Sequence, residues 1–148
     1  MLDDNFPDHI GWLLWRASQN WNLEFVQQMQ QAGHAWFTGA RSTVMAHIAP
    51  RGTKQAVLVE RLGISKQAVQ QLVDGLEADG ILIRGPDDED RRGRIVRLTE
   101  AGRAAIADAN RIKLEIEARY RAGLGEEAFA TLAELLGKLP QSRRTPVA

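Results

Sequence analysis

The sequence predicts a mainly α-helical protein with one small β-hairpin, and two observations carry this prediction. Apolar residues recur at steps of three and four along most of the 148-residue chain, which is the period of a helix that packs on one side. Two short runs rich in isoleucine, leucine and valine, 81–84 and 95–98, flank a charged stretch that contains glycine and proline. Such a pair of runs is typical of two strands joined by a loop. The length fits one compact folding unit.

Two helices are expected before residue 50. An apolar stripe predicts a long helix over 8–32, and Gly33 follows at the place where a glycine commonly ends a helix. Thr38 is placed to cap a second helix through its hydroxyl, and Pro50 stops that helix.

The central part predicts two helices separated by a tight turn. A short helix follows Thr53 and ends at Gly63, whose missing Cβ permits a left-handed backbone. Ser65 is the expected N-cap of the next helix, 66–79, which Gly80 terminates. The apolar residues of this helix share one face, so its outer face consists of Lys66, Gln67, Gln70, Gln71 and Asp74.

Two further helices are expected after the hairpin. Thr99 begins one that continues to about Arg121, and the other spans 126–139 before Pro140 stops it. Each carries an apolar stripe that needs a partner surface. In the last helix this stripe is expected to face inward and includes Phe129, Leu132, Ala133, Leu136 and Leu139.

Composition and charge exclude several classes of protein. The 19 basic and 19 acidic residues give zero net charge, so the chain as a whole carries no basic signature for nucleic acid. Cysteine is absent, which excludes disulfides, thiol nucleophiles and thiolate metal sites. No apolar run is long enough for a bilayer, and the acidic N-terminus lacks the features of a signal peptide. We therefore expect a cytoplasmic protein without a membrane partner.

No catalytic or cofactor motif is visible in the sequence. The three histidines lack paired metal spacing, and there is no glycine-rich phosphate loop or nucleophile elbow. The chain is therefore not expected to be an enzyme, and neither a metal nor a cofactor is expected.

The order of the elements predicts a winged helix-turn-helix. A helix, a short glycine turn, a second helix and a hairpin with a basic tip follow one another between residues 53 and 98. Small and amide side chains suit the major groove of DNA, and hairpin arginines can reach the adjacent minor groove. The expected contacts come from the recognition helix, at Ser65, Lys66, Gln67, Gln70 and Gln71, and from the wing, at Asp90, Arg91, Arg92 and Arg94. The alternative is that both are ordinary solvated surfaces.

Two segments, 62–82 and 88–103, resemble the MarR family of transcriptional regulators. The second is similar to the wing signature of that family, here Asp88, Asp90, Arg91, Arg92, Leu98, Thr99 and Gly102. The resemblance implies a DNA-binding regulator, commonly a repressor. The alternatives are a winged regulator of another family, such as the PadR type, which lacks this signature, and a winged helix that serves only as a protein-interaction module.

The resemblance also implies roles for single residues. Arg92 would enter the minor groove, Asp90 would hold it by an ion pair, and Arg94 would contact phosphate or the groove edge. The chain departs from the family at Gln70 and Gln71, where members often carry a hydroxyl residue followed by arginine. Amides pair with adenine and arginine prefers guanine, so no particular operator sequence is implied.

The long terminal helices indicate that the chain has two parts. Residues 1–35 and 104–148 are expected to be dimerisation helices, and residues 36–103 to be the winged helix-turn-helix core. A core of that size cannot bury long apolar helices at both ends, and family members bury them against a second subunit. The resemblance thus implies a homodimer that binds a palindromic operator. The alternative is a monomer in which the terminal helices cover one another.

Tryptophan is concentrated near the N-terminus, with three of the four on the first predicted helix and the last just after it. By the resemblance, small phenolic or aromatic effectors bind where the dimerisation helices meet the winged core. An aromatic wall with one cation suits such a ligand, so the candidate effector pocket consists of Trp12, Trp15, Arg16, His34 and Trp36. The alternative is that the tryptophans only fill a core.

Overall fold

The computed structural model describes residues 9–140 and confirms the mainly helical fold class. Within this range the chain forms six helices and one three-stranded antiparallel sheet. The helices are α1 (Ile10–Gln31), α2 (Gly39–Met45), α3 (Gln55–Leu62), α4 (Lys66–Ala78), α5 (Glu100–Leu124) and α6 (Glu126–Lys138). The strands are β1 (Thr53–Lys54), β2 (Leu82–Pro86) and β3 (Arg94–Leu98). None of the helices between residues 9 and 140 is long and apolar enough to cross a membrane.

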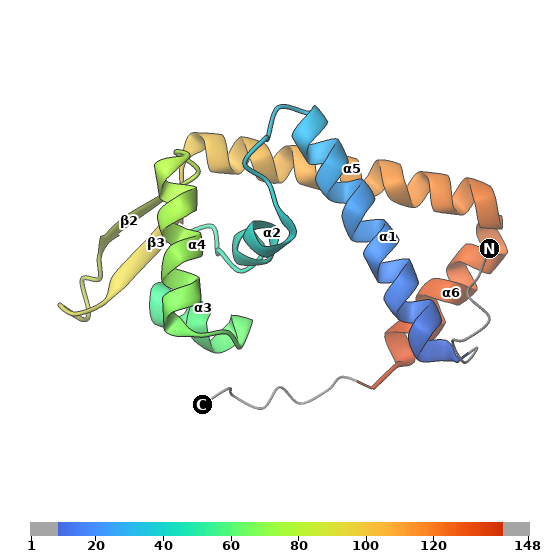
Figure 1. Ribbon diagram of the computed structural model, residues 1–148, viewed down its shortest axis with the longest axis horizontal. Coiled ribbons are helices and arrows are strands. Elements are labelled where there is room, and N and C mark those ends of the chain that lie inside the picture. Colours follow the sequence, from blue (N-terminus) through green and yellow to red (C-terminus); the bar gives the residue numbers. More distant parts are fainter. Residues whose placement is uncertain (1–8, 141–148) are drawn as a thin grey trace.

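The elements form an arch that α5 spans (Figure 1). One end of the arch is a winged lobe, made of α2, α3, α4 and the sheet. Toward the other end, α1 packs against α5, and α6 turns back from the end of α5. Helix α5 therefore links the winged lobe to the terminal helices as one continuous rod.

Local capping chemistry starts three helices where the sequence predicts them. The hydroxyls of Thr38, Ser65 and Thr99 each accept a hydrogen bond from the backbone N–H three residues later, at 3.2, 3.1 and 3.1 Å. Gly63 ends α3 with a φ of 63°, a left-handed conformation that glycine adopts without strain. These four predictions are confirmed.

Three helix boundaries differ from the predictions by two residues or more, and one of them is the end of α5, which reaches Leu124 and not only Arg121. Helix α1 begins at Ile10 because the ring of His9 caps it, its Nδ1 accepting the Trp12 N–H at 3.2 Å. Helix α2 ends at Met45, well before Pro50, because the next backbone hydrogen bonds close tighter, three-residue turns.

The sheet contains a third strand that the sequence analysis did not predict. Strand β1 pairs antiparallel with β3, which gives the order β1-β3-β2 and places Thr53 opposite Val96. It is only two residues long and therefore shows no alternating pattern. The Thr53 hydroxyl also fastens the preceding turn, donating to the His47 carbonyl at 3.2 Å and accepting from the Ala49 N–H at 2.9 Å. The wing is thus attached to the start of α3.

Two apolar clusters form the core, and they meet at Trp36. The first fills the winged lobe around Leu58, Val73 and Val96, which are fully buried. The second joins α1, the α1–α2 loop and α5, and consists of Phe25, Met29, Phe37, Ala109, Ile112 and Ile116. The half-buried Trp36 packs against both clusters.

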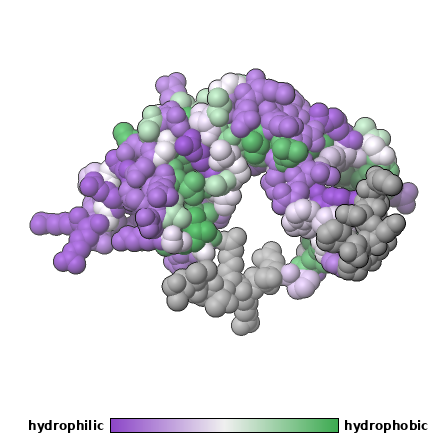
Figure 2. Space-filling model, viewed as in Figure 1, coloured by the Kyte–Doolittle hydropathy of each residue, from purple (hydrophilic) through white to green (hydrophobic). Residues whose placement is uncertain are grey.

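The apolar faces of the terminal helices stay exposed in the single chain. No residue of α6 is buried, and Leu132, Leu136 and Leu139 remain 41%, 46% and 47% exposed. On α1, Leu13 is 41% exposed. The prediction that the α6 stripe faces inward is therefore wrong for one chain. Helices α1 and α5 bury part of their apolar faces against each other, but among residues 9–140 of one chain no helix covers the apolar face of α6, as the monomer alternative requires. Figure 2 shows hydrophobic residues gathered on the hollowed inner side of the arch.

The start of α5 passes close to the turn after α4. A Cβ at Gly102 would lie 2.3 Å from the carbonyl oxygen of Ile81, far inside van der Waals contact. The Thr99 hydroxyl donates to the carbonyl of Gly80 at 2.6 Å, and the Thr99 N–H donates to that of Ile81 at 3.0 Å. Close packing therefore requires the last glycine of the wing signature.

We expect Gly102→Ala to lower the free energy of unfolding by about 1–3 kcal/mol, because the added methyl group must displace the Ile81 backbone. Gly123→Ala on the same helix is the control, because a Cβ there meets nothing within 4 Å and alanine favours a helix. Denaturant unfolding of both variants and the parent measures the difference. Equal stability of Gly102→Ala and the parent would contradict the packing role.

Candidate nucleic-acid interface

Helix α4 is held in place by a cation that crosses it. The guanidinium of Arg41, from α2, donates to Asp79 at 2.6 Å and to the carbonyl oxygen of Trp36 at 3.0 Å. A Cβ at Gly75 would lie 2.6 Å from Arg41 Nη2, so this glycine makes room for the guanidinium. The apolar face of α4 is buried in the winged lobe, which leaves its opposite face to solvent.

The outer face of α4 carries the predicted recognition residues. The exposed members are Ser65, Lys66, Gln67 and Gln71. Gln70 differs from them because it is half-buried and both ends of its amide are engaged. Gln55 Nε2, from α3, donates to Gln70 Oε1 at 2.6 Å, and Gln70 Nε2 donates to Asp74 at 3.0 Å.

The predicted wing residues lie at the exposed end of the β2–β3 hairpin. This group consists of Asp90, Arg91, Arg92 and Arg94. The Asp90 carboxylate accepts a hydrogen bond from the backbone N–H of Arg92 at 3.0 Å. Within the described residues it forms no ion pair with the Arg92 guanidinium, so Asp90 has a different role from the one implied by the resemblance. It fixes the backbone from which Arg92 extends.

A buried acid that the sequence analysis did not single out, Asp87, anchors the base of the wing. Its side chain is 3% exposed, and one carboxylate oxygen accepts the Glu89 N–H at 3.0 Å. The other lies 3.3 Å from Lys54 Nζ, which also donates to Glu89 at 3.1 Å. The Glu89 N–H, followed by the Lys54 ammonium, holds the pKa of Asp87 below its ordinary value. Nothing in the local sequence distinguishes Asp87 from the acids beside it, because its ion-pair partner Lys54 lies on β1, far earlier in the chain.

A cation that was also not singled out, Arg84 on β2, joins the wing to α4. Its guanidinium pairs with Asp74 and, at 3.2 Å, with Glu77, and its backbone N–H donates to Glu77 at 2.9 Å. The hydrogen bond from the Arg84 side chain lowers the pKa of Glu77, and the Glu77 carboxylate raises the pKa of Arg84. The only sequence signals were Asp74 on a predicted outer face and Arg84 at the end of a predicted strand.

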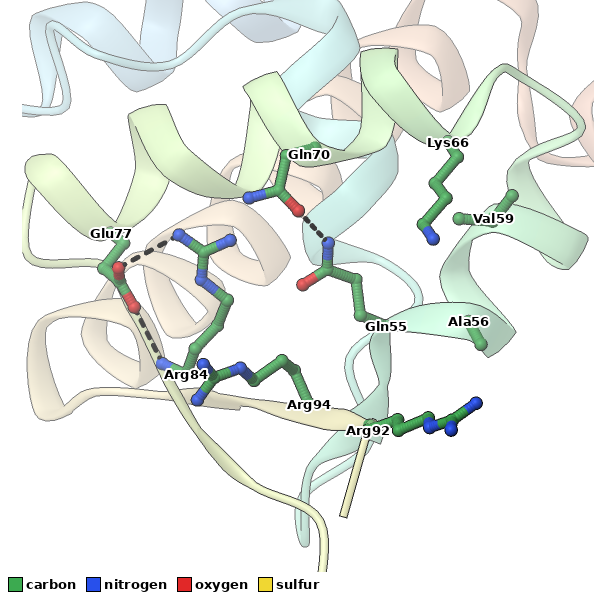
Figure 3. Close-up of a pocket in the computed structure, with 10 residues that line it drawn as sticks. Gln55, Ala56, Val59, Lys66, Gln70, Glu77, Arg84, Arg92 and Arg94 are labelled. Atoms are coloured by element: carbon green, nitrogen blue, oxygen red, sulfur yellow. Dashed lines mark hydrogen bonds and ion pairs between the residues drawn. The ribbon is translucent and has the colours of Figure 1, made fainter. Parts of the chain in front are cut away.

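Helices α3 and α4 and the wing enclose a cationic groove of about 710 Å³ (Figure 3). The basic side chains that line it are Lys66, Arg84, Arg92 and Arg94, and the one acidic side chain is Glu77. Figure 3 shows that these side chains surround one space. Lys66 and Glu77 come from α4, and the three arginines come from the β2–β3 hairpin. Basic side chains outnumber acidic ones in this lining although the net charge of the chain is zero, and a cleft with an excess of one sign of charge concentrates its field.

The five residues of the predicted effector pocket form two groups in one chain. Trp12, Trp15 and Arg16 lie near the start of α1, where the two indole rings stack with their centroids 4.9 Å apart. His34 and Trp36 lie past its other end, edge to face with ring centroids 5.8 Å apart. Because α1 has 22 residues and rises about 1.5 Å per residue, about 30 Å separates the groups. A single chain therefore does not bring them together.

A different aromatic cleft, with a volume of about 500 Å³, lies between α1, α2 and α5. Its walls include Trp21, Phe25 and Phe37, and the ammonium of Lys113 lies 5.3 Å from the centroid of the Phe25 ring. The rest of the lining is mostly apolar, with the hydroxyls of Ser42 and Thr43 and the amide of Asn110 as its uncharged polar groups. This cleft could not be predicted from the sequence, because its residues come from segments far apart along the chain.

Both the sequence and the fold are similar to those of known regulators. Residues 37–93 match the MarR family. The HTH-type transcriptional repressor NicR of Pseudomonas putida is 32% identical over 111 residues, which are 72% of this chain and 68% of NicR. The HTH-type transcriptional repressor MdtR of Bacillus subtilis is 28% identical over 123 residues, which are 82% of this chain and 77% of MdtR.

Solved structures have the same architecture. The YusO protein of Bacillus subtilis is 27% identical and superposes with a TM-score of 0.70, covering 90% of this chain and 94% of YusO. The transcriptional repressor CouR, solved bound to a 23-mer DNA duplex, is 27% identical with a TM-score of 0.72, covering 88% of this chain and 91% of CouR. Together with the winged lobe and its signature residues, these similarities show that the chain belongs to the MarR family, whose members are transcriptional regulators and not enzymes.

Proposed function

We propose that the chain is a transcriptional repressor that binds a palindromic DNA operator as a homodimer and is released by a small aromatic acid. The observation that carries the proposal is the cationic groove between α4 and the wing, next to the exposed amides of α4. The names of NicR and MdtR as repressors, and the DNA duplex bound to CouR, support it.

The side chains around the groove differ in the part of DNA that they suit. Gln67 and Gln71 are exposed on α4 and suit adenine edges in the major groove, with which an amide pairs bidentately. Arg92 is exposed on the wing and suits the narrow minor groove, whose negative potential attracts arginine. Lys66 and Arg94 line the groove and suit phosphates, which set the position of the protein and carry no sequence information.

A second copy of the chain is the proposed partner of the exposed apolar faces. Helices α1 and α6 carry large apolar side chains on open surfaces, and contiguous apolar patches mark interaction sites. In this proposal 1–35 and 104–148 form the dimer, and 36–103 contacts DNA. A two-fold pair presents two recognition helices to half-sites about 34–36 Å apart, so the operator is expected to be palindromic.

Selection of DNA fragments from a random pool tests the DNA-binding part of the proposal. The expected result is a palindromic consensus whose affinity falls as the salt concentration rises. The double variant Gln67→Ala/Gln71→Ala is the specificity control, and it should lose preference at particular bases while it keeps salt-dependent binding to any duplex. If the parent selects no sequence and binds no duplex, the alternative of a winged helix that binds a protein gains support.

The aromatic cleft between α1, α2 and α5 is the proposed effector site. The Lys113 ammonium supplies a cation for a carboxylate, while Trp21, Phe25 and Phe37 supply apolar walls. The cleft joins α2 of the winged lobe to α5, so a ligand that prefers one arrangement of these helices shifts the affinity for DNA. Arg16 and the Trp12–Trp15 stack of the sequence prediction are not part of its lining.

We expect salicylate-like acids to quench tryptophan fluorescence saturably, because Trp21 lines the cleft. Lys113→Met should weaken this binding, and Arg16→Met is the control, because Arg16 is exposed on α1 outside the cleft. A coupling of about 1–3 kcal/mol would loosen DNA roughly 5–150-fold, and DNA must weaken the ligand by the same factor. If millimolar ligand produces neither saturable quenching nor release of DNA, the proposal of an aromatic effector fails, and the cleft is a packing feature between α1, α2 and α5.

A further inference from the structure

The recognition helix carries two carboxylates near the surface that contacts DNA in the proposed function. The side chains of Asp74 and Glu77 are 49% and 38% exposed, and Glu77 lines the cationic groove. DNA phosphates repel carboxylates, and in 0.1 M salt this repulsion extends over about 10 Å. A helix that brings both groups to DNA therefore needs a cation that neutralises them.

Arg84 contacts both carboxylates. Its side chain is 17% exposed, and its guanidinium bridges Asp74 and Glu77 while its backbone N–H holds the second oxygen of Glu77. Figure 3 shows these two dashed contacts with Glu77, which join β2 to α4. Arg92 contrasts with Arg84, because its side chain is exposed and its guanidinium makes no hydrogen bond or ion pair with any residue between 9 and 140. Arg84 is thus engaged within the protein, and Arg92 is open to DNA.

Asp74 connects Arg84 to α3 through two side-chain hydrogen bonds. It accepts a hydrogen bond from Gln70 at 3.0 Å, and Gln70 accepts one from Gln55 at 2.6 Å. A chain of polar side chains therefore runs from α3 through α4 to β2 of the wing. Because the amide of Gln70 is held at both ends, the base contacts of α4 fall to Gln67 and Gln71, which are exposed.

We infer that Arg84 is a positioning residue for DNA recognition, which neutralises Asp74 and Glu77 and fixes the wing relative to the recognition helix without touching DNA. The inference rests on the proposed function, because it concerns the same DNA-binding surface. The lowered pKa of Glu77 agrees with it, since the hydrogen bond from Arg84 stabilises the charged carboxylate.

Removing the cation and then the two negative charges tests the inference. Arg84→Met is expected to weaken binding to the selected operator about tenfold, because two uncompensated carboxylates then lie near the phosphates. Adding Asp74→Asn and Glu77→Gln to this variant is expected to restore most of the affinity. Arg84→Lys keeps the charge but not the planar fork, so its affinity should lie between those of Arg84→Met and the parent. Lys138→Met, a loss of one cation on α6, should bind as the parent does.

A direct phosphate contact by Arg84 predicts a different pattern. The triple variant would then bind as weakly as Arg84→Met, and the slope of log affinity against log salt would decrease in magnitude by about 0.9. That result, or unchanged affinity of Arg84→Met, would overturn the inference.

Circular dichroism melts set a temperature at which every variant is folded, so that a loss of folding is not taken for a loss of recognition. If the parent itself binds no DNA, the proposed function fails; if the parent binds and the triple variant is not restored, only this inference fails.

Discussion

Replacing both Leu132 and Leu136 with glutamate is expected to produce a monomer that binds its operator more than about 100-fold less tightly. The two leucines lie one helical turn apart on α6 and are 41% and 46% exposed in the single chain. In the proposed dimer they are covered by the second copy, where an unpaired carboxylate is costly. Each recognition helix of a monomer binds its half-site alone, which removes the gain of about 10²–10⁴ that linked binding gives.

Sedimentation velocity at micromolar concentration measures the oligomeric state of this variant, and fluorescence anisotropy of a labelled operator measures its affinity. Ala130→Glu is the matched control, because position 130 lies on the opposite side of α6 from Leu132 at about 3.6 residues per turn. The control should remain a dimer with the affinity of the parent. A double-glutamate variant that is still a dimer would contradict the proposal that α6 belongs to the interface.

Arg92→Ala is expected to weaken operator binding by about 1–3 kcal/mol, roughly 5–150-fold, because the arginine contact lies in a groove where the negative potential is concentrated. The unfolding free energy should not change, since the Arg92 side chain is exposed. Asp90→Ala should act in the same direction but less strongly, because Asp90 holds only the Arg92 backbone N–H, at 3.0 Å.

Titration of a labelled operator with each variant and with Lys138→Ala measures these differences. Lys138 is a cation on α6, far from the wing (Figure 1), so its loss controls for net charge. An Arg92→Ala variant that binds as tightly as the parent would show that the wing does not enter the groove.

The parts of the fold that follow from local chemistry could be predicted from the sequence. The hydroxyl caps Thr38, Ser65 and Thr99 act on backbone groups only three residues away, so their effect is visible in any short window. Strand β1 could not be predicted, because its two residues become a strand only through pairing with β3. A two-residue segment has no periodicity of its own.

The candidate site also has a part that could be predicted from the sequence and a part that could not. The outer face of α4 and the basic tip of the wing follow from helical spacing and from a charge run, and both could be located in the sequence. The contacts of Arg84 with Asp74 and Glu77, and of Asp87 with Lys54, join separate elements, and nothing in a single sequence pairs them. Closeness in sequence is also a poor guide to the effector residues, because most of α1 separates Trp12 and Trp15 from Trp36 within one chain.

Helix α5 runs without interruption from the winged lobe to α6, so a tilt at one end of the helix displaces the other end. With 25 residues the helix is about 37 Å long, so a tilt of about 5° at its α6 end moves its wing end by about 3 Å. This displacement is close to the step of about 3.4 Å between successive bases along a DNA strand. In the proposed dimer, a tilt of this size would displace each recognition helix by about one base step while the packing inside each winged lobe is kept. We therefore expect changes at the Arg121–Glu126 pair, at the joint between α5 and α6, to alter the operator spacing that the proposed dimer accepts.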